Sequence, residues 1–80
     1  MIFVYGGTDG ESFLNMIYRI DLCEMVMYGF KVDGEGRIGS GMGLIDSQLV
    51  IFGGSRLEEE EDRIITIHIH DSRFTKIKDI

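Results

Sequence analysis

Short apolar runs separated by polar turns set the pattern along the chain. Two of these runs, Ile2 to Gly7 and Leu49 to Gly54, end in a double glycine, and the second copy begins its glycines 47 residues after Gly6. A β-rich run closed by an aromatic residue and two glycines predicts a strand followed by a turn that requires positive φ. Recurrence at this spacing is typical of a modular repeat.

Further strands are predicted between the two copies and beyond the second. They cover residues 13–22, 25–32, 37–45, 63–70 and 73–80, with turns at 21–24, 33–36, 46–47 and 71–72 and polar loops at 8–12 and 55–62. Within 39–43, glycine occupies every second position, so one face of that strand carries almost no side chains. We expect another part of the chain to approach this face closely. The predicted fold class is all-β, built from antiparallel meanders.

Composition narrows the classes of protein to which the chain can belong. Its 80 residues suffice for one small domain, and 11 glycines without proline or tryptophan favour many short strands. The formal charge of −6 repels a phosphate backbone, so direct binding of nucleic acid is not expected.

The sequence also indicates where in the cell the protein is expected. No run approaches the roughly 18 apolar residues that span a bilayer, and no cleavable leader follows Met1. Cys23 is the only cysteine, which excludes an intrachain disulfide. We therefore expect an intracellular, cytoplasmic protein without a membrane segment.

A set of small, aromatic and charged residues follows a fixed order along the chain, and its glycine pair and its aspartate occur twice. The set comprises Gly6, Gly7, Tyr18, Asp21, Arg37, Gly39, Gly53, Gly54 and Asp71. This order resembles the kelch repeat, the four-stranded blade of a β-propeller, over essentially the whole chain. Met27 and Phe74 stand near the positions of the family's tryptophan, and we expect them to fill the space between blades.

The resemblance implies a single unit, residues 1–80, that forms a partial propeller of about two blades. Residues 1–36 would supply three strands of an incomplete first blade, and residues 37–80 all four strands of a complete second blade. Propellers close with about four to eight blades, so two blades leave apolar faces and one inner edge exposed. We therefore expect the chain to form a homo-oligomer or to dock into a larger protein partner.

Kelch domains commonly bind proteins, so the resemblance implies a protein-interaction or scaffolding module without catalysis. One alternative is a reduced subunit or fragment of a longer kelch protein. Another is a metal-dependent propeller enzyme, which is disfavoured because the sequence supplies neither a copper-ligand set nor a paired acid and base. No catalytic residue and no cofactor is assigned.

The acidic run is the first candidate for a binding site. It consists of Glu58, Glu59, Glu60, Glu61 and Asp62. Consecutive carboxylates repel each other and stay solvated, so a surface loop is the simplest interpretation. The functional interpretation is a contact for a basic surface of a partner, or weak binding of divalent cations.

Two other features have both a structural and a functional interpretation. His68 and His70 are two residues apart on a predicted strand, as in some metal-binding pairs, but no third ligand is indicated. The structural interpretation places His68 between blades, as the family's aromatic, and His70 near a turn. Arg37 precedes the glycine-rich strand, and the resemblance implies that it is held by hydrogen bonds between blades.

Overall fold

The computed structural model describes residues 1–32, 36–56, 59–60 and 63–80, and it contains only β-strands and their connections. The strands are β1 (Ile2–Tyr5), β2 (Met16–Asp21), β3 (Val26–Lys31), β4 (Gly41–Ile45), β5 (Gln48–Phe52), β6 (Ser55–Arg56), β7 (Glu59–Glu60), β8 (Ile65–His68) and β9 (Thr75–Asp79). The predicted all-β class is confirmed. Among the described residues, no helix has the length and apolarity needed to cross a bilayer.

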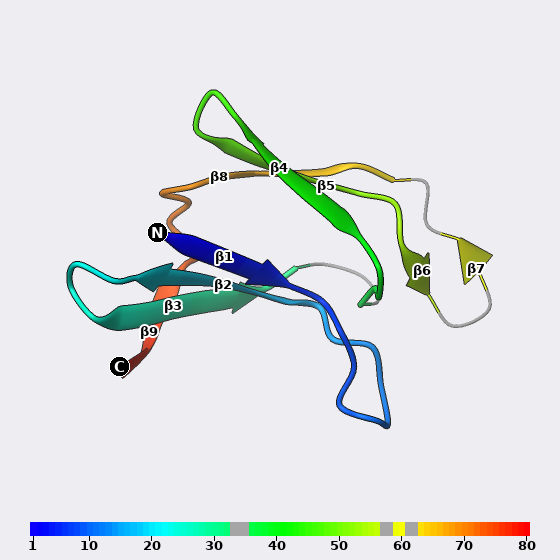
Figure 1. Cartoon of the computed structure of the whole chain (residues 1–80), viewed down its shortest axis with the longest axis horizontal. Helices are drawn as coiled ribbons and strands as arrows, with labels where there is room; N and C mark the ends of the chain where they lie inside the picture. The colour runs from blue at the N-terminus through cyan, green and yellow to red at the C-terminus, as the bar shows by residue number, and fades with distance from the viewer. Residues whose placement is uncertain (33–35, 57–58, 61–62) are drawn as a thin grey trace.

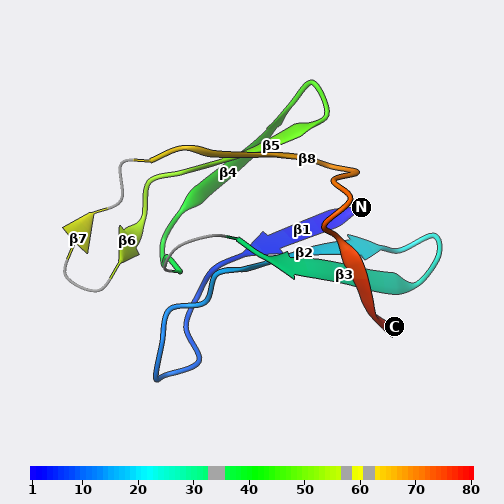
Figure 2. The same ribbon diagram turned by 180° about the vertical axis from the view of Figure 1, so that it is seen from behind.

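Two antiparallel sheets form the body of the molecule (Figure 1). Sheet A has the strand order β1-β2-β3-β9, and sheet D has the order β4-β5-β8. The two sheets lie as two layers, one above the other in the view of Figure 1, and β6 and β7 form a small separate pair. The reverse view in Figure 2 shows β9 and β8 on the near side, opposite β1 and β4.

The last strand does not pair where the sequence predicts. Residues 73–80 were expected to complete a second four-stranded unit over 37–80, but β9 lies beside β3 in sheet A. The prediction of three strands followed by four is therefore wrong in its order, and the ranges 1–36 and 37–80 do not separate the two sheets. The physical reason lies in Phe74, which directly precedes β9.

Phe74 is buried with 8% of its surface exposed. Its ring packs edge-on against Phe30 of β3 at 4.7 Å between centroids, and it lies 6.5 Å from the ring of Phe3 in β1. Both neighbours belong to sheet A, so burying Phe74 brings the following strand to the edge of that sheet. Phe74 belongs to the buried cluster that includes residues of both sheets, and the expectation that it fills the space between blades stays a prediction.

The core lies between the inner faces of the two sheets. Residues directly opposite each other in antiparallel strands point to the same face. Ile17 pairs with Phe30 in sheet A, and Leu49 pairs with Ile67 in sheet D, and all four side chains are buried. Among the residues that the structure describes, the buried apolar set is Ile17, Phe30, Val32, Leu49, Ile51, Ile67 and Phe74.

The strands predicted over 13–22 and 37–45 begin later than expected, at Met16 and Gly41. Before β2, the side-chain nitrogen of Asn15 donates to the carbonyl of Val32, and Val32 N–H donates to the carbonyl of Asn15. Before β4, Gly39 has a φ of +69°, which turns the chain after a single bridge between Ile38 and Ser55. The strands β6 and β7, within the predicted loop 55–62, were not expected.

The β4–β5 hairpin has the tight turn that its length predicts. Asp46 and Ser47 both have positive φ, 47° and 66°, as the favoured two-residue hairpin turn requires. The face of β4 that its glycines leave almost without side chains is covered only in part. The ring of Phe52 lies across Gly41, whereas a Cβ added at Gly43 would meet nothing within 4 Å.

All four glycines of the two double-glycine turns have positive φ, as predicted: 78° and 97° at Gly6 and Gly7, and 68° and 90° at Gly53 and Gly54. Space is also limiting at one glycine of each pair. A Cβ at Gly6 would lie 2.5 Å from the carbonyl oxygen of Arg37, and one at Gly54 would lie 2.7 Å from that of Ile38. Glycine is therefore required at both turns for two independent reasons.

Gly6→Ala should lower the free energy of unfolding by about 2 to 4 kcal/mol, because it combines left-handed backbone strain with a clash against backbone. Gly43→Ala is the matched control, since its Cβ meets open space, and it should change stability by less than about 1 kcal/mol. Urea denaturation followed by circular dichroism measures both. Equal effects of the two substitutions would contradict this account of the turn.

Candidate interaction surface

Arg37 is the most buried charged side chain among the described residues, with 1% of its surface exposed. Its Nη1 donates to the carbonyl of Arg63 at 3.0 Å and to that of Gly53 at 3.5 Å. Both acceptors belong to the ends of neighbouring strands in sheet D. Five fixed donors suit a guanidinium for this bridging of backbone carbonyls, and its burial removes it from contact with an outside ligand.

The backbone around Arg37 joins the two double-glycine turns. Gly7 N–H donates to the carbonyl of Arg37 at 2.9 Å. The next residue, Ile38, exchanges two hydrogen bonds with Ser55, which directly follows Gly54. One short segment therefore contacts the turn after β1 in sheet A and the turn after β5 in sheet D.

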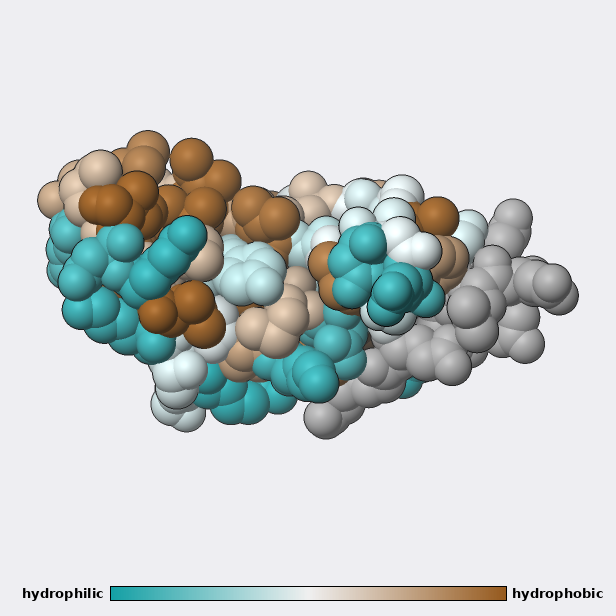
Figure 3. Space-filling model, turned by 90° about the horizontal axis from the view of Figure 1, so that it is seen from below, coloured by the Kyte–Doolittle hydropathy of each residue, from teal (hydrophilic) through white to brown (hydrophobic). Residues whose placement is uncertain are grey.

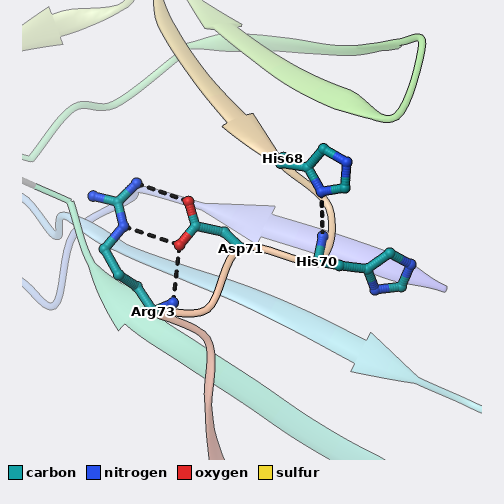
Figure 4. A network of polar contacts seen from close by, with 4 residues as sticks. All are labelled: His68, His70, Asp71 and Arg73. Carbon is teal, nitrogen blue, oxygen red and sulfur yellow. Dashed lines mark hydrogen bonds and ion pairs between the residues drawn. The ribbon is translucent and has the colours of Figure 1, made fainter.

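The two predicted turn aspartates perform the same task at their turns. Oδ1 of Asp21 accepts hydrogen bonds from the N–H groups of Cys23 and Glu24. Oδ1 of Asp71 accepts from the N–H and the Nε of Arg73, and Nη2 of Arg73 donates to Oδ2 (Figure 4). Both carboxylates thus replace backbone acceptors where the chain reverses.

The two histidines lie at the surface, at the end of β8 and in the turn that follows. Their ring centroids are 6.0 Å apart, and Nδ1 of His68 accepts the N–H of His70. In Figure 4 the carboxylate of Asp71 is turned away from both rings toward Arg73. Within the described part of the chain, no group of three or more histidine, cysteine, aspartate or glutamate residues could hold a metal ion. The side chain of His68 is exposed, and its expected position between blades stays a prediction.

The acidic run cannot be placed as a site. Glu58, Glu61 and Asp62 lie outside the described residues, and only the backbone of Glu59 and Glu60, in β7, is described.

Tyr18 and Gly39 are the remaining residues of the predicted motif, and they lie in different parts of the molecule. Tyr18 is half-buried on the outer face of sheet A, and Gly39 is exposed in the turn before β4.

The outer face of sheet A, turned away from sheet D, is apolar. Ile2 pairs with Ile20 and then Met27 across three strands, and these residues point opposite to the buried Ile17 and Phe30. We define the outer face by Ile2, Val4, Tyr18, Ile20, Met27 and Ile77. Its exposed members include Ile2 at 46%, Val4 at 44% and Ile77 at 46% of their surface.

Side-chain packing at Gly29 confirms which residues share this face. A Cβ added at Gly29 would lie 3.0 Å from Cδ1 of Tyr18 and 3.4 Å from Cγ1 of Ile77. The view from below in Figure 3 looks onto this side of the molecule. Hydrophobic surface gathers there on the half that carries the N terminus and the β2–β3 turn, with hydrophilic surface beside it. Contiguous apolar surface of this kind is typical of interaction sites.

Arg19 is a residue whose role the sequence did not indicate. Its Nη1 donates to the carbonyl of Ile69 at 2.7 Å, between β8 and β9. Its guanidinium carbon lies 4.5 Å from the ring centroid of Tyr28 and 4.8 Å from that of Phe74. The signal available was the position of Arg19 two residues after Ile17, which places it on the inner face of a strand.

Arg37→Ala should lower the free energy of unfolding by about 2 to 4 kcal/mol, because it leaves buried carbonyls without their donor and opens a cavity. Lys78→Ala on exposed β9 is the control and should change stability by less than about 0.5 kcal/mol. Chemical denaturation measures both variants. Reduced binding of a partner by folded Arg37→Ala, with unaltered unfolding, would instead indicate a ligand-binding role.

Stability should also decrease at acidic pH, where Asp71 becomes protonated. The hydrogen bonds and charge of Arg73 lower the pKa of Asp71 from its ordinary value of 3.8 to about 2. Because the folded-state pKa lies below the unfolded one, this contribution is complete above about pH 4 and is lost as the pH falls toward 2. Asp71→Asn should flatten the dependence of stability on pH in this window, whereas Asp46→Asn in the β4–β5 turn should retain it. Thermal unfolding between pH 2 and pH 7 provides the measurement.

The chain was compared with protein-family models, with curated protein sequences and with solved structures, and none of them matches it.

Proposed function

We propose that the chain is a protein-interaction or scaffolding module of kelch type, made of two partial blades and completed by self-association or by docking into a larger assembly. The single observation that carries the proposal is the apolar outer face of sheet A. A sheet that already covers the core with one face and still presents isoleucine, valine, methionine and tyrosine on the other is suited to packing against another layer.

The repeated turns support the kelch interpretation of the fold. Each double glycine follows an apolar strand, each is hydrogen-bonded or bridged beside the Arg37–Ile38 segment, and each copy has an aspartate that closes a later turn. Two antiparallel sheets packed face to face are also how neighbouring blades pack in a propeller. The position of β9 beside β3 departs from a regular second blade, so the proposed unit is a partial and modified one.

An uncovered sheet face also explains why association would be required for the protein's role. A chain of 80 residues has a small core, and its stability is marginal on size alone. Covering the outer face with another layer would remove additional apolar area from water, and each Å² removed stabilises the protein by about 25 cal/mol. Association would therefore stabilise the fold and define its function together.

Ile77→Lys should shift the protein from an assembly toward a 9.1 kDa monomer, or abolish its capture of a partner, because it places a charge on the outer face, on its β9 side. Ile64→Lys is the matched control, since Ile64 is 66% exposed and lies outside the outer face, and it should leave assembly unchanged. Sedimentation velocity and native mass spectrometry of the complex purified from its source measure both. A stable, folded, lone monomer would overturn the proposal.

A further inference from the structure

Sheet A ends at β1, and within the described part of the chain no strand lies along Ile2–Val4 on the side away from β2. In the described part of the chain, β1 pairs only with β2. Gly6 N–H donates to the carbonyl of Met16, so the opposed pair Gly6 and Met16 is a hydrogen-bonded one. Such pairs alternate along an antiparallel ladder, so Val4 and Ile2 also point their backbone groups toward β2, and Phe3 points its N–H and C=O outward.

Just beyond the end of β1, the backbone on this side of the sheet already makes one outward hydrogen bond, at Gly7. Gly7 has the same parity as Phe3, and its N–H donates outward to the carbonyl of Arg37. The backbone of Arg37 therefore marks where a further strand would lie beside β1. After Arg37 the chain turns at Gly39 toward β4, so residues 37–41 do not continue along Ile2–Val4.

The two edges of sheet A differ in their protection. The sequence of β9 contains Lys76, Lys78 and Asp79, and charged edge residues of this kind discourage pairing with another strand. The sequence of β1 contains no charged residue and no proline. An edge strand without these features is a template for an added strand.

Acidic groups stand at both ends of β1. Asp21, the last residue of β2, lies beside the first residues of β1, as the pairing of Ile2 with Ile20 requires. Glu24 follows in the β2–β3 turn, where its Oε2 accepts from the hydroxyl of Tyr28 at 3.4 Å. Asp9 and Glu11 lie in the loop that follows its last residues. Hydrogen bonds from the backbone of Ser12 and of Glu11 lower the pKa of Asp9 from its ordinary value of 3.8.

This charge pattern opposes pairing between two copies of the chain through β1. An antiparallel pair would place Asp9 and Glu11 of one copy near Asp21 and Glu24 of the other, and a parallel pair would place identical groups side by side. Like charges brought within a Debye length of about 8 Å repel each other at physiological salt. The formal charge of −6 on each copy adds to this repulsion.

We propose that the β1 edge binds an extended segment of a partner protein, with alternating apolar residues in its centre and lysine or arginine at both ends, as an added strand of sheet A. This inference depends on the proposed interaction function and names the partner's chemistry and its place. The N–H and C=O of Phe3 pair with the added strand. Its apolar residues extend the outer face beside Ile2 and Val4, and its basic ends meet the two acidic turns.

The test uses two labelled nine-residue peptides, KRVTVTVRK and EDVTVTVDE, and fluorescence anisotropy with the full chain at 150 mM salt. The basic-ended peptide should bind, and the acidic-ended peptide should bind at least about tenfold more weakly. Hydrogen exchange of the complex should show new protection of the Phe3 amide. Equal binding of the two peptides, or a complex in which Phe3 exchanges as in the free protein, would overturn the proposal.

Variants separate the backbone contribution from the side chain and the charges. Phe3→Pro removes the outward N–H and should weaken the basic-ended peptide at least about tenfold, whereas Phe3→Val keeps the N–H and should bind within about threefold of the original chain. Glu11→Gln combined with Glu24→Gln should weaken binding about fivefold and reduce its salt dependence, whereas Asp46→Asn should not. Tight binding by folded Phe3→Pro would contradict the edge site.

Failure of this inference and failure of the proposed function give different results. If the peptides do not bind but Ile77→Lys still disrupts the native assembly, the interaction function stands and the β1 edge is not the site. If the chain instead forms dimers in which the Phe3 amide is protected and competes with peptide, the edge is occupied by a second copy and the basic partner segment is wrong.

Discussion

The structure depends on one short backbone segment, Arg37–Ile38, which both double-glycine turns contact. Gly7 donates to Arg37 from the side of sheet A, and Ser55 exchanges two bonds with Ile38 from the side of sheet D. The buried guanidinium of Arg37 then binds carbonyls at the ends of β5 and before β8. Without side chains at Gly6 and Gly54 the three backbones approach closely, and this is why the repeated motif is a glycine pair.

A second connection between the layers is aromatic. Phe74 is buried between Phe30 and Phe3, and Arg19 lies against its ring while donating to the carbonyl of Ile69. The burial of one large ring contributes about 2 to 3 kcal/mol, which favours the path that buries Phe74 over one that leaves it exposed. The chain therefore crosses from sheet D to sheet A, and β9 protects one edge of sheet A with its lysines.

As a result of these two connections, the two faces of sheet A differ from each other, and so do its two edges. Its inner face is covered by sheet D, while its outer face carries exposed apolar residues such as Ile2, Val4 and Ile77. Its β9 edge is charged, while its β1 edge is neutral and lies between acidic turns. The two features suit different contacts: the outer face suits packing of a further layer, and the β1 edge suits hydrogen bonding of a further strand.

The sequence by itself determined the features that depend on local geometry. Alternation and glycine placement predicted the seven longer strands, the positive φ of the double glycines and the Asp46-Ser47 hairpin, because backbone sterics act within a few residues. Only the tertiary structure decided which strand β9 joins, that His68 is exposed, and that Arg19 contacts Phe74. Those outcomes depend on contacts between residues about 50 positions apart, as with Arg19 and Ile69, and many strand pairings share the same alternating pattern. The β1 edge depends on both the sequence and the tertiary structure. The sequence determines that β1 has no charged residue, and the fold determines that no neighbouring strand lies beside it within the described chain.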